Sequence, residues 1–517
     1  MAWKNLLQRE YLLPERVYIF DTTLRDGEQT PGAALKPEDK IRVAEALDEL
    51  GVDIIEAGFP LVSKGEAEAV KTIANMKLKA KICALARAEK MDIDAALNAD
   101  VDWIHVFIAT SDIHLKHKLR LTREEALEKA RSMVEYAKEH GVTVHFSAED
   151  ATRTEPSFLM RVFREVEKAG ADSIDIPDTV GTALPYAMRY LVRLTKENVK
   201  VPVSVHCHDD FGLAVANSLA GVEAGAEIIH ATINGIGERA GNASLEEIVS
   251  ALNFLYGVKT NIRLENLYKT SRLVEKLTGI IVPKNKAIVG DNAFSHESGI
   301  HVHGILGSPH TYEPVMPESF GRRRRIVFGK HSGAHGVEAL LKEYGFTVER
   351  EKLRKILARI KEIGDSGGRV SEEDVLSIAT QVYGKQTLER SSIRRLSISK
   401  VDGEYDAACE LIVAHEIVAG RGAGSNPVTA SLRAALKAVE SIADVQLVDY
   451  KVLSGMFDER HPAEAEVILR IKDTETVGRG LDKDPAAAIT SAVASAVHQL
   501  LLSQSNYMRV ESGHRDG

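Results

Sequence analysis

From Phe20 to Gln29 the chain reads Phe-Asp-Thr-Thr-Leu-Arg-Asp-Gly-Glu-Gln, directly after the apolar run 17–20. An apolar run of strand length that ends in two acids, a base and a glycine predicts a buried strand, with polar residues in the loop at its carboxyl end. Enzymes with alternating strands and helices carry their chemistry at that end. Arg25 and Asp26 are therefore candidate functional residues, with a structural ion pair as the alternative.

From Val17 onward, short β-branched runs alternate with helical patterns at a steady pitch. Helical spacing of apolar residues marks the segments 37–50, 122–140, 156–169 and 244–256. Eight strand–helix units within about 240 residues predict a (β/α)8 barrel, because an open doubly wound sheet normally uses fewer strands. The eight predicted strands are 17–20, 53–59, 81–87, 103–109, 142–148, 173–178, 201–207 and 228–234.

The composition is that of an ordinary globular protein. The 517 residues are 44% hydrophobic and 27% charged, and the chain is long enough for more than one domain. The net charge of −9 argues against a nucleic-acid partner. The sequence contains no apolar run of about 18 residues, so no membrane span is predicted. Cys83, Cys207 and Cys409 are widely spaced, so we expect no disulfide framework and a reducing, cytoplasmic location.

In a barrel all strand ends meet at one mouth. Residues two apart on a strand point the same way, so His206 and His208 are expected to face together while Cys207 points to the helices. Two imidazoles and one carboxylate form a facial metal site with positions open for a substrate, and Asp26 is the predicted carboxylate. A pair of hydrogen-bonded core histidines is the alternative. Asn242 is predicted to add an amide oxygen, which suits magnesium, manganese or zinc.

The other strand ends also carry polar side chains. Because strand ends converge in a barrel, these side chains are expected to act at the same mouth. They are Glu56, Arg87, His105, Ser147, Glu149, Asp175 and Thr179.

Four long motifs carry a family resemblance. The segments 21–29, 206–217 and 234–242 resemble the signature motifs of the 2-isopropylmalate, homocitrate and citramalate synthase family, and the segment 290–304 resembles its second domain. The resemblance extends from residue 16 to the end of the chain. It implies a Claisen-type condensation of acetyl-CoA with a 2-oxo acid, assisted by a divalent metal (Mg, Mn or Zn).

The resemblance also implies roles for individual residues. Arg25 would stabilise negative charge on the ketone or enolate oxygen. Thr179 resembles the residue that holds the substrate carboxylate. Glu149 and His301 resemble the acid–base pair, with Tyr312 as an assistant; a structural hydrogen-bonding role is the alternative for all three. The metal ligands would be Asp26, His206 and His208, with Asn242 in or near the shell.

The choice of 2-oxo acid depends on fewer positions. His105, Ser147 and the segments 106–114 and 301–303 look more like 2-isopropylmalate synthases, which implies 2-oxoisovalerate and the first committed step of leucine biosynthesis. Asp175 stands where those enzymes are expected to have asparagine, so citramalate synthase, which uses pyruvate, remains an alternative. One methylene is worth only about 1–3 kcal/mol of discrimination. Homocitrate synthase and a lyase of the 3-hydroxy-3-methylglutaryl-CoA type are further alternatives.

The chain is predicted to divide into four segments, and the third of them contains four consecutive arginines. The run 322–325 of four arginines is either a solvated surface or a site for the phosphates of coenzyme A. The resemblance implies that the segment containing this run reaches over the barrel mouth of a partner subunit, so a homodimer is expected. The segments are an N-terminal extension (1–15), the barrel (16–285), helical subdomains that complete the active site (286–391) and an α+β regulatory domain (392–517).

The last segment contains an internal repeat. Gly-Arg-Gly at 420–422 before Asn426-Pro427 recurs at 478–480 before Asp484-Pro485, a displacement of 58 residues. Alternating apolar runs precede each copy and an alanine-rich helix follows it, which predicts a pseudo-twofold regulatory fold. The helix N-termini suit a small carboxylate ligand, and the resemblance implies leucine. A dimerisation module without a ligand is the alternative.

Overall fold

The computed structural model describes residues 11–329, 331–343, 348–366, 368, 370, 372–383, 392–401, 403–413, 416–453, 463–471, 474–482 and 484–512. Most of the predicted N-terminal extension (1–10) and the predicted junction at 384–391 lie outside these described residues. The chain divides into two compact units. One runs to Ile326 without Glu297–Ile300, and the other combines Glu297–Ile300 with the residues from Val327 onward.

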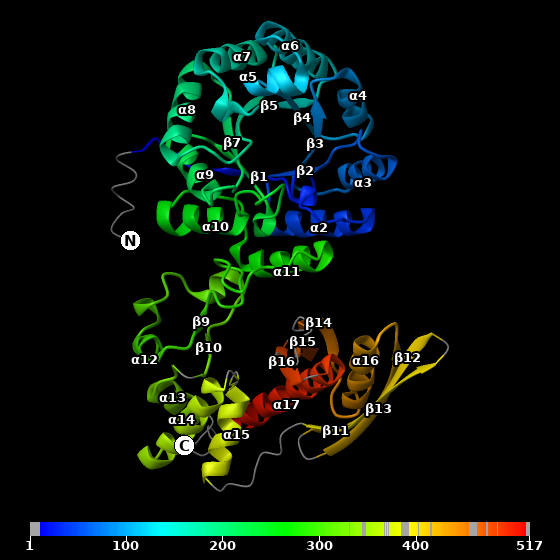
Figure 1. Ribbon diagram of the computed structural model, residues 1–517, viewed down its shortest axis with the longest axis vertical. Helices are drawn as coiled ribbons and strands as arrows, with labels where there is room; N and C mark the ends of the chain where they lie inside the picture. Colours follow the sequence, from blue (N-terminus) through cyan, green and yellow to red (C-terminus); the bar gives the residue numbers. More distant parts are fainter. Residues whose placement is uncertain are drawn as a thin grey trace. The chain divides into compact units, whose positions relative to one another are not determined.

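Eight parallel strands close into a barrel in chain order (Figure 1). The closing pair is β1 with β8, in which Phe20 lies beside His230. The predicted (β/α)8 architecture is therefore confirmed. The strands are β1 (Tyr18–Asp21), β2 (Ile54–Gly58), β3 (Lys81–Arg87), β4 (Trp103–Ala109), β5 (Thr143–Glu149), β6 (Ser173–Asp178), β7 (Val203–Cys207) and β8 (Ile228–Ala231).

Helices cover the outside of the barrel, and local sequence explains where they form. In α6 the side chains of Thr122 and Glu125 build a capping box, and buried alanines and valine recur along one face. The helices are α2 (Pro37–Leu50), α3 (Lys64–Asn75), α4 (Lys90–Asn98), α5 (Asp112–His114), α6 (Arg123–Glu139), α7 (Pro156–Lys168), α8 (Pro185–Asn198), α9 (Ala214–Glu223), α10 (Leu245–Ser250) and α11 (Leu267–Thr278).

One predicted strand is too long. The run 228–234 leaves the sheet after Ala231, because Ile233–Gly235 form a 3-10 turn in which Asn234 has a φ of 63°. Asparagine tolerates this left-handed conformation better than most residues. The turn begins the loop that later brings Asn242 back to the strands.

The barrel interior changes from apolar to polar along the strands. Phe20, Ile54, Cys83 and Ile228 form a buried apolar cluster. Two residues further along β2 and β8, on the same face, lie Glu56 and His230. The carboxyl ends of the strands therefore hold the polar groups, as expected for this fold.

The region after the barrel is mainly helical, and two of its four consecutive arginines have specific partners. Arg322 is buried, donates to the carbonyl oxygens of Ile288 and Gly290 at 2.6 and 2.8 Å, and lies over the ring of Tyr268. Arg324 pairs with Glu313. For these two arginines a solvated surface was the wrong interpretation, because their guanidinium groups are used inside the fold. The elements are β9 (Ser295–His296), α12 (Gly299–Gly307), β10 (Arg325–Ile326), α13 (Ala334–Glu343), α14 (Arg350–Asp365) and α15 (Glu372–Tyr383).

The C-terminal domain has the predicted repeat. β13 and β16 begin at Glu416 and Thr474, and α16 and α17 begin at Pro427 and Pro485, so both displacements are 58 residues. Each half is a three-stranded antiparallel sheet with a helix, and the halves share one apolar core. The elements are β11 (Ser392–Val401), β12 (Glu404–Val413), β13 (Glu416–Gly424), α16 (Pro427–Val439), β14 (Gln446–Leu453), β15 (Ala463–Ile471), β16 (Thr474–Asp482) and α17 (Pro485–Ser512).

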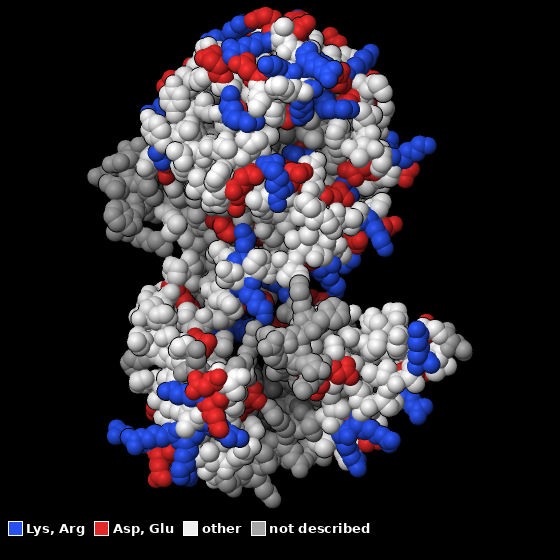
Figure 2. Space-filling view, in the orientation of Figure 1, with Lys and Arg blue, Asp and Glu red and all other residues white. Residues whose placement is uncertain are grey.

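Two surface properties bear on the predicted partners. On the face shown in Figure 2, lysine and arginine side chains of the described residues are interspersed with aspartate and glutamate. None of the described helices combines the length and the apolar character that crossing a bilayer requires. The expectation that nucleic acid is not a partner stays a prediction.

Glycine in β13 allows α16 to pack directly on the sheet. A Cβ on Gly420 would lie 2.2 Å from the carbonyl oxygen of Ala434. Gly420→Ala should therefore separate strand and helix and destabilise the C-terminal domain by about 1–3 kcal/mol. Hydrogen–deuterium exchange of the intact protein would show this as faster exchange in β13 and α16. Gly307→Ala, whose Cβ would meet nothing within 4 Å, is the control. Unchanged exchange in Gly420→Ala would contradict the close packing.

Candidate metal centre

The turn after β1 places Arg25 and Asp26 at the barrel interior. The backbone N–H groups of Arg25, Asp26 and Gly27 all donate to the carbonyl oxygen of Thr22, at 2.8–3.1 Å. This winds the chain around one oxygen. Gly27 lies so close to Ile236 that an added Cβ would be 3.1 Å from its side chain. As a result, only 2% of the Asp26 side chain is exposed.

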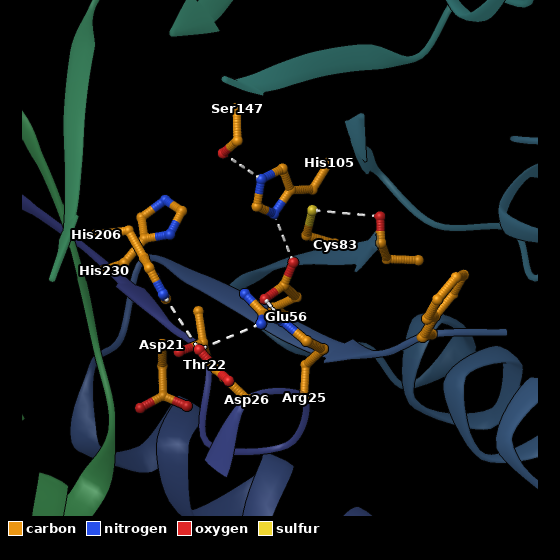
Figure 3. Close-up of polar contacts among 12 residues, drawn as sticks. Asp21, Thr22, Arg25, Asp26, Glu56, Cys83, His105, Ser147, His206 and His230 are labelled. Carbon is orange, nitrogen blue, oxygen red and sulfur yellow. Dashed lines mark hydrogen bonds and ion pairs between the residues drawn. The ribbon is translucent and has the colours of Figure 1, made fainter. Parts of the chain in front are cut away.

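His206 on β7 and His208, directly after its end, lie close to this carboxylate, and Figure 3 shows His206 next to Asp26. His206 Nε2 lies 3.1 Å from Asp26 Oδ2, and His208 Nε2 lies 3.6 Å from the same oxygen. The two imidazole nitrogens are 3.1 Å apart. Cys207 between them is buried in the core between strands and helices. The three side chains are therefore arranged as a facial two-His-one-carboxylate site requires.

The protonation states also suit a cation. Burial alone would raise the pKa of Asp26, but the charge of Arg25 and the contacts with His206 and His208 hold it well below its ordinary value. Burial and the neighbouring His206 lower the pKa of His208 to about 3. A carboxylate and neutral imidazoles are the forms that bind divalent metals.

Asn242 lies beside the triad with an unused amide group. It forms an isolated antiparallel bridge with His208, and both of its side-chain amide atoms are buried without a hydrogen-bond partner. A Cβ on Gly237 would lie 2.7 Å from Asn242 Nδ2, so a residue without a side chain leaves room for the amide. An unpaired buried amide costs free energy, which a cation bound to its oxygen would recover. The four side chains fit a divalent cation with nitrogen and oxygen ligands.

Three predicted substrate residues lie together inside the barrel. His105 Nε2 is 2.5 Å from Ser147 Oγ, and Ser147 donates to Asp175 Oδ2 at 2.6 Å. Sequence reasoning placed Glu56 at the mouth without a role. The structure shows that its carboxylate contacts both His105 Nδ1 and Arg25 Nε, each at 2.6 Å. Its place two residues past a buried isoleucine, facing inward, is the signal that could have identified it.

A second group of possible ligands consists of His105, His145 and Asp175. Their ligand atoms already have partners: the His105 and Asp175 atoms bond to Ser147, and His145 Nε2 lies 3.0 Å from His230 Nε2. Burial lowers the pKa values of His145 and His230 well below the ordinary range, so both rings are neutral. This group is therefore a set of hydrogen-bonded core residues. That arrangement was the alternative interpretation for His206 and His208.

Glu149 and Thr179 follow the fifth and sixth strands. The Glu149 carboxylate lies 2.5 Å from Lys118 Nζ and 3.5 Å from His114 Nδ1. Thr179 Oγ1 accepts a hydrogen bond from the backbone N–H of Asp150 at 2.8 Å. The hydroxyl proton of Thr179 therefore stays available for another acceptor.

His301 and Tyr312 lie in the segment after the barrel. Their ring centroids are 4.4 Å apart. Within the part of the chain that the structure describes, no hydrogen bond, ion pair or ring contact joins either residue to the triad. The next residue, Glu313, is buried and holds both His296 and Arg324. Within the described residues of one chain, none of these contacts therefore joins His301 or Tyr312 to the metal triad.

One residue predicted to act at the barrel mouth turns away from it, and one lysine of α2 is buried. Arg87 at the end of β3 turns to Asp92 at 2.7 Å and does not join the site. Lys40 on α2 is buried and donates to Glu28 and Glu66 at 2.8 and 2.7 Å. A cavity of about 380 Å³ lies beside this ion-pair cluster and is lined on one side by Arg25.

The chain matches known families over most of its length. Residues 16–274 match the family described as HMGL-like, residues 288–368 the homocitrate synthase post-HMGL domain-like family, and residues 369–501 the LeuA allosteric (dimerisation) domain. A probable 2-isopropylmalate synthase of Methanopyrus kandleri is 51% identical over 497 residues, which are 94% of this chain and 99% of that protein.

Two proteins of Methanocaldococcus jannaschii are similar to the same degree. A 2-isopropylmalate synthase is 49% identical and covers 95% of this chain and 95% of its own length. An (R)-citramalate synthase is also 49% identical and covers 94% of this chain and 99% of its own length. Overall similarity therefore does not distinguish between these two names.

The triad can be tested by metal binding without an activity assay. His208→Asn should weaken Mn²⁺ binding by more than about 100-fold in calorimetric titration, because loss of a ligand costs more than loss of a residue that only orients one. Asp210→Asn is the control, since Asp210 pairs with Arg239 at 2.8 Å and is not one of the three ligands. Equal affinity of His208→Asn and the wild-type protein would show that the cation binds elsewhere.

Proposed function

The chain belongs to the family of 2-isopropylmalate, citramalate and homocitrate synthases, and from that premise we propose that it condenses acetyl-CoA with 2-oxoisovalerate (3-methyl-2-oxobutanoate) to give 2-isopropylmalate and CoA. This reaction is the first committed step of leucine biosynthesis, which we place in the cytoplasm. A carbon–carbon bond forms between the acetyl methyl group and the ketone carbon, and water hydrolyses the thioester. The buried Asp26, His206 and His208 triad with Arg25 beside it carries the proposal.

The first requirement of the reaction is an electrophilic ketone. The triad and Asn242 would hold a divalent cation (Mg, Mn or Zn), which would supply Lewis-acid polarisation of that ketone. Arg25 adds a fixed positive charge: Glu56 and Asp26 keep the pKa of its guanidinium above the ordinary value although burial opposes this. Arg25 Nη1 lies 3.2 Å from Asp26 Oδ2, so the guanidinium is held where negative charge develops on the substrate oxygen.

The second requirement is a base for the acetyl methyl proton. We assign it to Glu149, acting with His301 and Tyr312. Glu149 ends β5, and 16% of its side chain is exposed, so a substrate at the barrel mouth can reach it. Thr179 would donate its free hydroxyl proton to the carboxylate of the 2-oxo acid.

The third requirement is that His301 reaches Glu149. Because no contact within the described chain joins them, we assign His301 and Tyr312 to the active site of a partner subunit in a homodimer. The match of residues 369–501 to the LeuA allosteric (dimerisation) domain supports both a dimer and an effector. Leucine is the proposed effector, and it must bind two states of the enzyme with different affinity.

We assign the choice of the 2-oxo acid to His105, Ser147 and Asp175, which are hydrogen-bonded to one another inside the barrel. We favour 2-oxoisovalerate, with pyruvate and hence citramalate synthase as the second candidate, because relatives with both names are equally similar. Discrimination against pyruvate rests on contacts with two methyl groups and is therefore modest.

The test is release of CoA thiol from acetyl-CoA by the metal-loaded enzyme. 2-Oxoisovalerate, pyruvate and 2-oxoglutarate are offered in parallel, each with and without leucine. We expect the highest kcat/KM with 2-oxoisovalerate and a lower rate with leucine. Preference for pyruvate would replace the proposed substrate, and no thiol release with any 2-oxo acid would overturn the synthase assignment.

Sharing of the active site between subunits predicts complementation. Glu149→Gln and His301→Asn should each lower kcat by about 100-fold or more, because each removes a proton-transfer group. Mixed and refolded together, they should recover part of the activity, since one of the two sites in a mixed dimer contains both native residues. Each variant unfolded and refolded alone is the control, and neither should recover activity. Absence of recovery in the Glu149→Gln mixture would place both residues in one subunit's site.

A further inference from the structure

Six side chains inside the barrel form one continuous hydrogen-bonded chain, part of which Figure 3 shows. It starts in the loop after β1 and runs across β2, β4, β5, β6 and β7. Every link is 2.5 or 2.6 Å between heavy atoms. In order, the members are Arg25, Glu56, His105, Ser147, Asp175 and Ser204.

The direction of the hydrogen bonds follows once Asp175 is taken as an ionised carboxylate. A carboxylate can only accept, and Asp175 is bonded by Ser147 at Oδ2 and by Ser204 at Oδ1, each at 2.6 Å. A serine hydroxyl has one proton. Because Ser147 gives its proton to Asp175, its oxygen must accept in the 2.5 Å contact with His105 Nε2. That ring nitrogen therefore carries a proton.

The other ring nitrogen faces an ionised carboxylate. Burial would raise the pKa of Glu56, but the charge of Arg25 and the hydrogen bonds from Arg25 and His105 hold it below the ordinary value. An ionised Glu56 accepts at both oxygens: from Arg25 Nε at one and from His105 Nδ1 at the other, each at 2.6 Å. The Nδ1 atom of His105 therefore carries a proton as well.

We propose that His105 is a buried imidazolium and that Asp175 is the positioning residue that keeps it charged. Asp175 accepts the single hydroxyl proton of Ser147, so Ser147 can only accept a hydrogen bond from the ring. The negative charge of Asp175 is then balanced by the positive charge of His105 on the other side of Ser147. This carboxylate therefore adds no net negative charge inside the barrel. The aromatic groups packed against His105 are Phe20, His145 and His230, and both of these histidines are neutral.

The charged ring also acts on Arg25. Glu56 is held between two cations, so its carboxylate, and through it the guanidinium of Arg25, keeps one orientation. Replacing Asp175 by asparagine preserves the shape of the chain but reverses one hydrogen bond. The amide can donate to Ser147, Ser147 can then donate to His105 Nε2, and the ring becomes neutral while it still donates from Nδ1 to Glu56.

The protonation state can be measured directly by NMR of ¹⁵N-histidine in the full-length, Mg²⁺-loaded enzyme at pH 8, where exposed histidines are neutral. The signals of His105 are identified by their loss in His105→Gln. We expect protons on both ring nitrogens in the wild-type protein and on one nitrogen in Asp175→Asn. Ser204→Ala is the matched control, because it removes the other donor to Asp175 and leaves the Ser147 bond in place. His105 should stay doubly protonated in that variant.

Two outcomes would overturn the proposal: a singly protonated His105 in the wild-type protein, or a doubly protonated His105 in Asp175→Asn. If Asp175→Asn does not fold, Ser147→Ala gives the same reading. It removes the acceptor of the Nε2 proton and should also leave the ring with one proton. These readouts need no substrate.

The effect on catalysis rests on the proposed function and is measured separately. A hydrogen bond from a charged ring is stronger than one from a neutral ring, so a neutral His105 would hold the Glu56 carboxylate less firmly. Asp175→Asn should therefore lower kcat about tenfold. Mn²⁺ affinity should stay near the wild-type value, because Asp175 does not belong to the triad. A neutral ring in Asp175→Asn with unchanged kcat would show that the charge does not position Arg25.

Discussion

Asp26 carries a carboxylate at a place where water hardly reaches it. A buried charge costs several kcal/mol unless opposite charges and polar groups replace the lost water. In this protein Arg25 comes from the same loop, whereas His206 and His208 come from the seventh strand. The first and seventh strands are separated by a single strand in the closed barrel, because β1 pairs with β8 and β8 pairs with β7. The candidate metal centre therefore depends on barrel closure, and a bound cation would in turn stabilise the closed barrel.

The same constraint shapes the rest of the barrel interior. Glu56, like Asp26, is fully buried, and it is stabilised by Arg25 from one side and His105 from the other. Asp175 is buried as well, but its partners are hydroxyl groups and not a direct cation. Ser147 and Ser204 each donate one proton to it, and of these two hydroxyls Ser147 is the one that also contacts His105. A substitution at Asp175 is therefore expected to change the protonation of a ring two hydrogen bonds away.

The C-terminal domain follows a different packing rule. Its core combines many alanines with valine, leucine and isoleucine side chains. Glycines in β13 and β16 let α16 and α17 approach the strands so closely that a Cβ would overlap helix backbone atoms. The two copies of this packing, 58 residues apart, build one shared core from both halves of the domain. A ligand or subunit that changes the contact between the halves would change the packing of both, because they share that core.

Periodicity in the sequence was enough for the barrel, for helices such as the one predicted at 122–140, for the shared face of His206 and His208 and for the C-terminal repeat. Each of these depends on neighbours within a few residues or on an exact repetition. Sequence did not assign the link from Glu56 to both Arg25 and His105, the turn of Arg87 away from the mouth or the burial of Arg322. Those features depend on which strands become neighbours and how far apart their side chains then lie. A strand pattern tells on which side of the sheet a residue lies; only the closed barrel decides which partner lies opposite, and with it where each proton and charge is held.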